Sequence, residues 1–212
     1  MRHFMKFYKT FPLLLLTIVL SSNILTSCVK DDDNEDTLPE LTQEEKDMLI
    51  KMREEEKLAR DVYEYLYEKY PSFTIFGNIS SSEQVHMDRV LALLEKYNLE
   101  DPALPNRGEF SDPDLQELYT QLITMGETSE VDALKVGATI EDLDIYDLEE
   151  YTALTNNIDI LQVFENLTCG SRNHMRAFYG QLILLNETYI PQFISQEEFD
   201  AIVNSPKERC GM

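Results

Sequence analysis

The 212-residue chain contains no Trp, only three Cys and three His, and few basic residues. Its 18 Lys and Arg stand against 40 Asp and Glu, which gives a formal net charge of −22. This balance excludes proteins that bind the phosphate backbone of nucleic acids, because such proteins need a basic surface. The Cys and His are too few for a zinc ribbon or a disulfide-rich miniprotein. Hydrophobic residues make up 43% of the chain, which distinguishes it from a disordered acidic tail.

Residues 1–27 have the features of an export signal. Three basic residues precede an apolar run at 11–20 (FPLLLLTIVL), which is too short for a comfortable membrane span. The quartet Leu25-Thr26-Ser27-Cys28 resembles a bacterial lipobox, in which Cys28 is lipidated and becomes the first residue of the mature chain. The alternative is an ordinary signal peptide in which the Cys has no such role.

Residues 28–40 form an acidic tether that begins at the lipidated Cys28 and contains the run DDDNED. A segment of this composition cannot bury enough apolar surface to fold. It resembles the export tether of surface lipoproteins in Bacteroidetes-type bacteria. We therefore expect a protein of the bacterial cell envelope, lipid-anchored to the outer membrane and exposed at the cell surface. Its acyl chains must provide the anchoring, because an acidic chain is repelled by anionic lipids.

Two cysteines, Cys169 and Cys210, remain once Cys28 is assigned to the lipid. In an oxidising compartment they are expected to form a disulfide that ties the C-terminal tail, residues 206–212, to a helix. The alternative is a pair of free thiols, because the spacing in the sequence gives no distance between them.

Residues 41–205 have the pattern of a helical domain. Thr42 and Glu45 form a capping box, and the stripe through Met52, Glu56 and Tyr63 continues at spacings of three and four up to residue 70. We expect further helices at 80–97, 113–126, 129–148 and 158–185, and a short one that is capped at residue 195. Strand alternation is weak throughout. The expected fold is an all-α four-helix bundle with a short extra helix in the crossover and a short C-terminal helix.

Ionisable residues occur on the helix faces that should be buried. An isolated ionised carboxylate is too costly to bury unless it is paired or bound to a metal. After removal of the signal, the two remaining histidines both lie on such faces. The candidate metal ligands are Glu56, Glu83, His86, Glu141, Asp144 and His174.

Each candidate also has an ordinary explanation. Glu56 follows Glu54 and Glu55, and a small rotation of the helix would expose all three side chains to solvent. Glu83 can complete a capping box with Ser80. Glu141 and Asp144 lie in an acidic run that suits a solvated face, and each His can be a hydrogen-bonded core residue. The convergence of these residues on four helices of one bundle is what favours a site.

Carboxylate and imidazole ligands suit iron, manganese and zinc. Di-iron sites in bundle cores take a Glu from each of two helices and Glu-x-x-His from each of the other two. Several carboxylates placed together repel one another and need cations. The metal-bound protein should therefore be more stable than the metal-free protein.

The same residues carry a resemblance to known proteins. Glu56-x-x-Ala59-Arg60-x-x-Tyr63 looks like the first helix of rubrerythrin-type ferritin-like proteins, and Glu83-x-x-His86 matches the next. Residues 40–205 resemble the ferritin-like domain of the "domain of unknown function 2202" family in the segments EEKLARDVY (55–63), SEQVH (82–86), VGATIEDLDIYDL (136–148) and GSRNHMRAF (170–178). The resemblance implies a metal-binding protein. More specifically, it implies a non-haem di-iron oxidoreductase or an oxidative-stress protein.

One position departs from the ferritin pattern, because Ser171 stands where the last helix should carry the Glu that pairs with His174. A single metal, or a pair with unusual geometry, therefore remains open. A redox enzyme of this kind would need electrons from another protein, since the chain has no Cys-x-x-Cys module. The alternative function is a non-enzymatic surface lipoprotein whose bundle holds a structural metal or a buried polar network. The sequence leaves the oligomeric state open.

Overall fold

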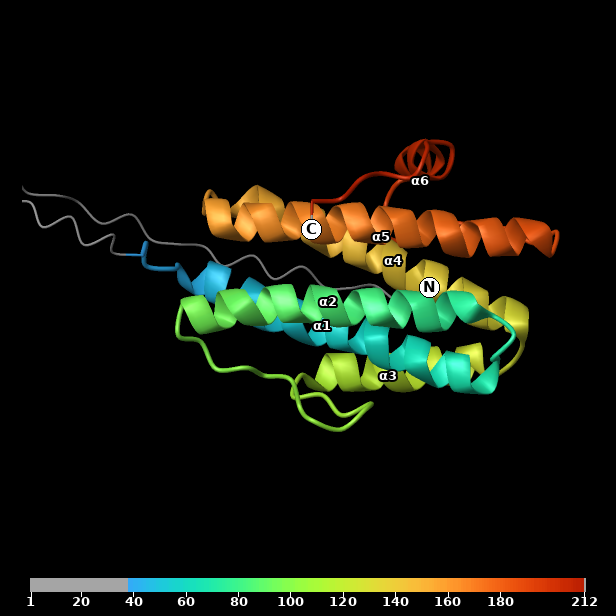
Figure 1. Cartoon of the computed structure of the whole chain (residues 1–212), viewed down its shortest axis with the longest axis horizontal. Coiled ribbons are helices and arrows are strands. Elements are labelled where there is room, and N and C mark those ends of the chain that lie inside the picture. The colour runs from blue at the N-terminus through green and yellow to red at the C-terminus, as the bar shows by residue number, and fades with distance from the viewer. Residues whose placement is uncertain (1–37, 212) are drawn as a thin grey trace, which may run out of the picture. The chain divides into compact units, whose positions relative to one another are not determined.

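A computed structural model describes residues 38–211, which contain six helices and no strand. Four helices are long: α1 (Gln43–Lys69), α2 (Thr74–Lys96), α4 (Glu130–Leu154) and α5 (Ile158–Leu184). The shorter α3 (Pro113–Gly126) lies in the connection from α2 to α4, and α6 (Gln196–Val203) lies near the C-terminus (Figure 1). The prediction of an all-α bundle is confirmed. The export signal, Cys28 and most of the tether lie outside the described residues.

The long helices pack as two neighbouring pairs, α1 with α2 and α4 with α5 (Figure 1). Between the pairs lies a core that includes three aromatic rings, Tyr63, Phe76 and Phe178, whose centroids are 5.2 to 6.3 Å apart. The predicted capping box at Thr42 is present, and predicted side-chain caps also begin α3, α4, α5 and α6. Local sequence signals therefore place the start of five of the six helices.

The start of α2 differs from the prediction. The helix begins at Thr74, about a turn and a half before the predicted start. The additional residues include Phe76 and Ile79, whose side chains are buried in the core. Ser80 lies inside the helix and its Oγ donates to the carbonyl oxygen of Gly77, 3.1 Å away. The alternative in which Ser80 and Glu83 form a capping box is therefore wrong. The predicted end of α4 at residue 148 is also too early, since the helix continues to Leu154, past Tyr151, whose ring packs against Phe164.

The acidic run in the middle of α1 is buried. Glu54, Glu55 and Glu56 are 2%, 7% and 0% exposed, so the alternative of a solvated face is wrong. The connection before α3 covers this region, and Glu54 accepts hydrogen bonds from the backbone nitrogens of Ser111 and Asp112. These bonds hold α1 in the rotation that turns Glu56 inward.

A second set of buried charges fastens the same connection. Lys57 is 1% exposed and its Nζ lies 2.5 Å from Oδ2 of Asp61, which is fully buried. Lys57 also donates to the carbonyl oxygens of Asn106 and Glu109, and Asp61 accepts from the backbone nitrogen of Gly108. Charged groups of one helix face are thus satisfied by backbone atoms about 50 residues further along the chain.

Candidate metal centre

Five of the six predicted ligands meet in the interior of the bundle. Glu56 comes from α1, Glu83 and His86 from α2, Glu141 from α4 and His174 from α5. The three carboxylates are at most 1% exposed, so the alternative of a solvated acidic face for Glu141 is wrong. The two imidazole rings lie stacked, with centroids 5.5 Å apart and planes inclined by 26°.

Glu83 is the central residue of this arrangement. Its Oε2 lies 2.7 Å from Nδ1 of His86, and its Oε1 lies 2.9 Å from Nδ1 of His174. Glu56 approaches His86 Nδ1 to 3.1 Å, and Glu141 approaches His174 Nδ1 to 3.4 Å. The atoms therefore form two groups that each fit one metal ion, Glu56–Glu83–His86 and Glu83–Glu141–His174, with Glu83 common to both.

Five buried side-chain atoms of these residues lack a hydrogen-bond partner among the described residues. The unpartnered atoms are Oε1 of Glu56, both carboxylate oxygens of Glu83, Oε2 of Glu141 and Nδ1 of His174. His174 Nδ1 and Glu83 Oε1 are close, but they do not point at each other as a donor and acceptor would. Buried polar atoms are normally satisfied, and each one left alone is costly. Several that face a common space fit a bound cation.

The pKa values of the carboxyl groups reflect their burial. Burial raises the pKa of Glu56 to about 7, although the neighbouring His86 lowers it in part. Burial likewise raises the pKa of Glu141. Burial also acts on Glu83, but the positive charges of His174 and His86 outweigh it and hold the pKa of Glu83 below its usual value. Glu83 is therefore the carboxylate that stays ionised without a metal.

The two imidazoles are affected in the opposite direction. Burial lowers the pKa of His174, but the carboxylates of Glu83 and Glu141 outweigh it and raise this pKa to about 10. In the same way, Glu56 and Glu83 raise the pKa of His86 well above its usual value. The metal-free centre thus holds protons on both rings. A metal must displace them, because only the neutral imidazole is a ligand.

Asp144, the sixth predicted ligand, lies beside the two ligand groups but belongs to neither. Its Oδ2 accepts a hydrogen bond of 2.9 Å from Oγ of Ser171, the residue that departs from the ferritin pattern. Burial and the nearby carboxylates of Glu56, Glu141 and Glu83 raise the pKa of Asp144 well above its usual value. The Ser on α5 thus makes room for a carboxyl group from α4, which is suited to hold a proton next to the centre.

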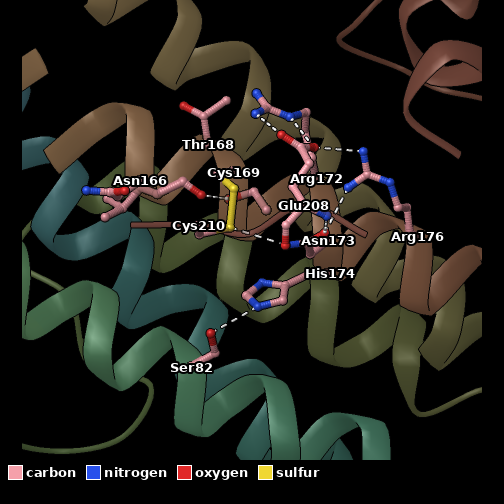
Figure 2. Close-up of a disulfide and its surroundings, with 12 residues drawn as sticks. Ser82, Asn166, Thr168, Cys169, Arg172, Asn173, His174, Arg176, Glu208 and Cys210 are labelled. Carbon is pink, nitrogen blue, oxygen red and sulfur yellow. Dashed lines mark hydrogen bonds and ion pairs between the residues drawn. A yellow bond between two sulfur atoms is a disulfide. The ribbon is translucent and has the colours of Figure 1, made fainter. Parts of the chain in front are cut away.

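Three further residues complete the surroundings of the centre. Tyr63, which lies on the same predicted stripe as Glu56, is fully buried and its hydroxyl donates to Oε1 of Glu141 at 2.5 Å. Nε2 of His174 lies 3.0 Å from Oγ of Ser82 on α2, as Figure 2 shows. Sequence reasoning missed Ser82 because its contact crosses from one helix to another.

Gly170 is the third such residue. An added Cβ at this position would lie 2.6 Å from Nε2 and 2.7 Å from Cε1 of His86. The absence of a side chain therefore leaves the space that the imidazole ring occupies. A Gly within a helix pattern was the only sequence signal for this contact.

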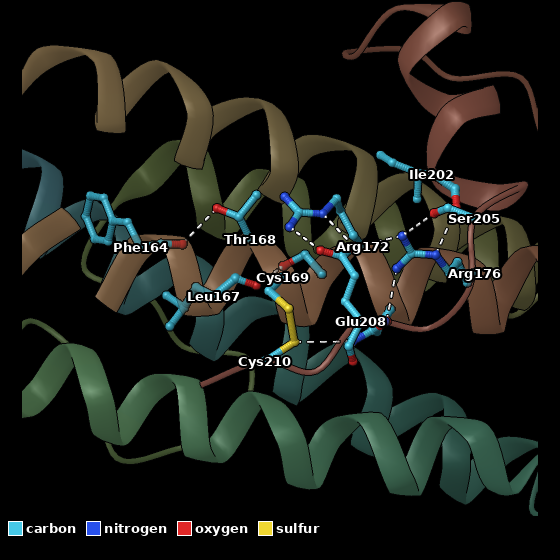
Figure 3. Close-up of polar contacts among 12 residues, drawn as sticks. Phe164, Leu167, Thr168, Cys169, Arg172, Arg176, Ile202, Ser205, Glu208 and Cys210 are labelled. Atoms are coloured by element: carbon cyan, nitrogen blue, oxygen red, sulfur yellow. Dashed lines mark hydrogen bonds and ion pairs between the residues drawn. A yellow bond between two sulfur atoms is a disulfide. The ribbon is translucent and has the colours of Figure 1, made fainter. Parts of the chain in front are cut away.

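The predicted disulfide between Cys169 and Cys210 is present, with Cα atoms 5.6 Å apart, and the alternative of two free thiols is wrong for this structure. It fastens the C-terminal tail to α5 at the residue next to Gly170 (Figure 2). Glu208 of the same tail accepts from Arg172 and Arg176, which also lie on α5 (Figure 3).

Among residues 38–211, none of the helices has an apolar stretch of the length that a membrane span requires. Residues 45–206 match the family model described as "Uncharacterized protein domain (DUF2202)". The chain is 57% identical over 170 residues to the uncharacterized protein MJ0754 of Methanocaldococcus jannaschii, covering 80% of this chain and 91% of that protein.

The crystal structure of the hypothetical protein MJ0754 from Methanococcus jannaschii matches with a TM-score of 0.78 and 56% identity. The match covers 81% of this chain and 99% of the MJ0754 chain in that crystal structure. An archaeal relative gives no support to the expected Bacteroidetes-type source, which rested on the tether alone. The match over residues 45–206, together with this relative, shows that the chain belongs to the DUF2202 family.

Proposed function

We propose that this protein is a ferritin-like metalloprotein that holds two metal ions, preferably iron, between its four long helices and acts as an oxidoreductase. The observation that carries the proposal is the position of Glu83, which presents one buried, unpartnered oxygen toward each of two histidines. A carboxylate in this position can bridge two cations, and Glu and His together suit iron, manganese and zinc.

The residues divide into two ligand sets. Glu56 and His86 would hold one ion and Glu141 and His174 the other, with Glu83 shared between them. Bound iron would supply one-electron redox chemistry toward oxygen or peroxide. Tyr63 fixes the orientation of Glu141 through its hydroxyl. Both cysteines in the described residues are paired with each other, so the electrons would come from an external donor.

We further propose that the protein acts at the bacterial cell envelope, attached by acyl chains on Cys28. The support for this part is the lipobox-like sequence before Cys28 and the acidic segment after it. The disulfide agrees with an oxidising compartment. Growth with a labelled fatty acid tests it, because replacement of Cys28 by Ser should abolish labelling and release the protein from the membrane fraction.

One observation favours the second candidate, a non-enzymatic protein with a structural metal or a buried polar network. Without a metal, two imidazoles with raised pKa values lie among the carboxylates, so the centre neutralises part of its own charge. The two candidates differ in redox activity. Iron that binds but does not cycle between oxidation states with oxygen or peroxide would favour the structural role.

Metal content decides the proposal. We expect elemental analysis of protein purified without chelators, and titration of metal-free protein with iron or zinc, to give two ions per chain. Replacement of Glu83 by Gln keeps the shape but removes the charge, and should abolish binding of both ions. The matched control is Glu95→Gln, an exposed residue on the same helix, which should bind two.

His86→Gln should reduce the stoichiometry to one ion per chain, because His174 and its carboxylates remain. Zinc uptake should release protons and weaken steadily as the pH falls below about 10, since the metal competes with protons for the imidazoles, whose pKa values are raised. A correctly folded native protein that takes up no metal would overturn the proposal.

A further inference from the structure

A groove of about 570 Å³ lies beside the candidate metal centre, and both of its histidines line it. Its walls come from α2, α5 and the tail residues 207–211. A second hollow of about 560 Å³ adjoins it and shares five of its lining residues, Asn78, Ser82, Asn173, His174 and Lys207. The metal centre is therefore reached from the surface between α2 and α5.

The tail is held firmly as the third wall. Cys210 is bonded to Cys169, and Glu208 accepts from Arg172 at 2.5 Å and Arg176 at 2.7 Å (Figure 3). The side chain of Asn173 accepts from the backbone nitrogen of Glu208. These contacts fix the backbone on both sides of Lys207 and Arg209, which line the groove.

The charge of the groove is opposite to that of the whole chain. Three of its lining residues, Arg89, Lys207 and Arg209, are cations that form no ion pair with any described residue. Its one acidic lining residue, Glu208, is already bound by two arginines. The chain has 40 acidic and 18 basic residues. A groove lined by three unpaired cations is therefore not expected from the composition. A concave basic region attracts and concentrates anions.

Most of the exposed lining of the groove is apolar, although Asn and Ser side chains of α2 and α5 also contribute to it. The apolar part is formed by Val85 of α2, by Leu167 and Gly170 of α5, and by the disulfide at Cys210. Small sites of this type combine an apolar surface with a few charged groups that orient the ligand. The combination suits an organic anion better than an inorganic one.

We propose that this groove binds a small organic anion, whose charged group is held by Arg89, Lys207 and Arg209 and whose apolar part rests on the exposed Val85 and on the disulfide at Cys210. Anion binding follows from the groove alone. The ligand's role as the substrate of the centre rests on the proposed function, because His86 and His174 lie in the same groove. The disulfide then has a purpose in binding, since it keeps two of the three cations in place.

Benzoate and benzamide provide a matched pair of probes, since they share a ring and differ in charge. Saturation-transfer NMR on the disulfide-intact protein measures binding of both, in the metal-free and the zinc-loaded state. We expect benzoate to bind about tenfold more tightly than benzamide, because each of three exposed charge pairs contributes about two- to threefold.

Charge variants then locate the site. A groove variant, R89Q/K207Q/R209Q, should reduce the affinity for benzoate to that for benzamide. These side chains are exposed, so the fold should be retained, which circular dichroism verifies. The control removes three cations away from the groove: K46Q/K69Q/R107Q. It should leave the preference for benzoate intact.

The outcomes separate this proposal from the metal centre. The groove proposal is overturned if benzoate does not bind, if benzamide binds equally well, or if the control weakens benzoate as much as the groove variant does. If the pattern holds in a protein that takes up no zinc, the groove stands and the metal centre falls. If zinc binds and the pattern is absent, only the groove proposal fails.

Discussion

Replacement of Gly170 by Ala tests how closely the fold positions His86. The new Cβ would lie 2.6 Å from Nε2 of the ring, whereas ordinary contacts begin at 3.4 Å. The ring must therefore move by about 0.8 Å, or α5 must move away from α2. The ring has little freedom to move, since Nδ1 on its other side lies within 3.1 Å of both Glu56 and Glu83. The displacement exceeds the roughly 0.5 Å that a ligand set tolerates.

The size of the effect follows from two opposing contributions. Overpacking a buried position costs about 1–3 kcal/mol, and Ala in place of Gly within a helix contributes about 1 kcal/mol in the other direction. Gly180 is the matched control, because it lies on the same helix and a Cβ there meets nothing within 4 Å. The free energy of unfolding should therefore be about 1–3 kcal/mol lower for Gly170→Ala than for Gly180→Ala.

Two assays measure the consequences in metal-free protein. Urea unfolding followed by circular dichroism gives the difference in stability, and zinc titration gives the affinity of each site. We expect the affinity of the Glu56–Glu83–His86 group to fall by about 10- to 100-fold in Gly170→Ala, as when a supporting residue of a metal site is lost. Equal zinc affinity and equal stability of the two alanine variants would refute the reasoning.

Three further predictions concern the residues around the centre. Asp61→Asn should lower the free energy of unfolding by about 3–5 kcal/mol, because it leaves the buried Lys57 without its countercharge; a loss below 1 kcal/mol in urea unfolding would contradict this. Replacing Cys169 and Cys210 together by Ser opens a loop with a sequence separation of 41, and chain entropy predicts a loss of up to about 4 kcal/mol in the same assay. Two arginines lower the pKa of Glu208 from 4.5 to about 2, so its contribution is complete above pH 4.5 and is lost as the pH falls toward 2. Relative to an exposed model disulfide at the same pH, the protein disulfide should then be reduced by a phosphine faster at pH 3 than at pH 6, and Glu208→Gln should reduce this difference; an unchanged relative rate would contradict the role of Glu208 in holding the tail.

The sequence predicted the helices and the inward orientation of the candidate ligands, because both follow from local spacing. Residues three and four apart share a helix face. A Glu or His within an apolar stripe is therefore predicted to face the interior. Prediction failed where distant residues decide. The buried carboxyl group of Asp142, for example, accepts from the backbone nitrogens of Gln192 and Ile194 and from the hydroxyl of Tyr189, about 50 residues away. In the sequence it is indistinguishable from its solvated neighbours.

The all-α class, the caps of five helices and six candidate ionisable residues for the interior follow from the sequence. Only the tertiary structure decided that Glu83 is shared by both ligand groups and that Gly170 leaves space for a histidine ring. It also decided that the tail brings cations to the groove. Helix periodicity depends on a few neighbouring residues, whereas these contacts depend on the rotation and distance of four helices relative to one another, which packing of the whole domain determines.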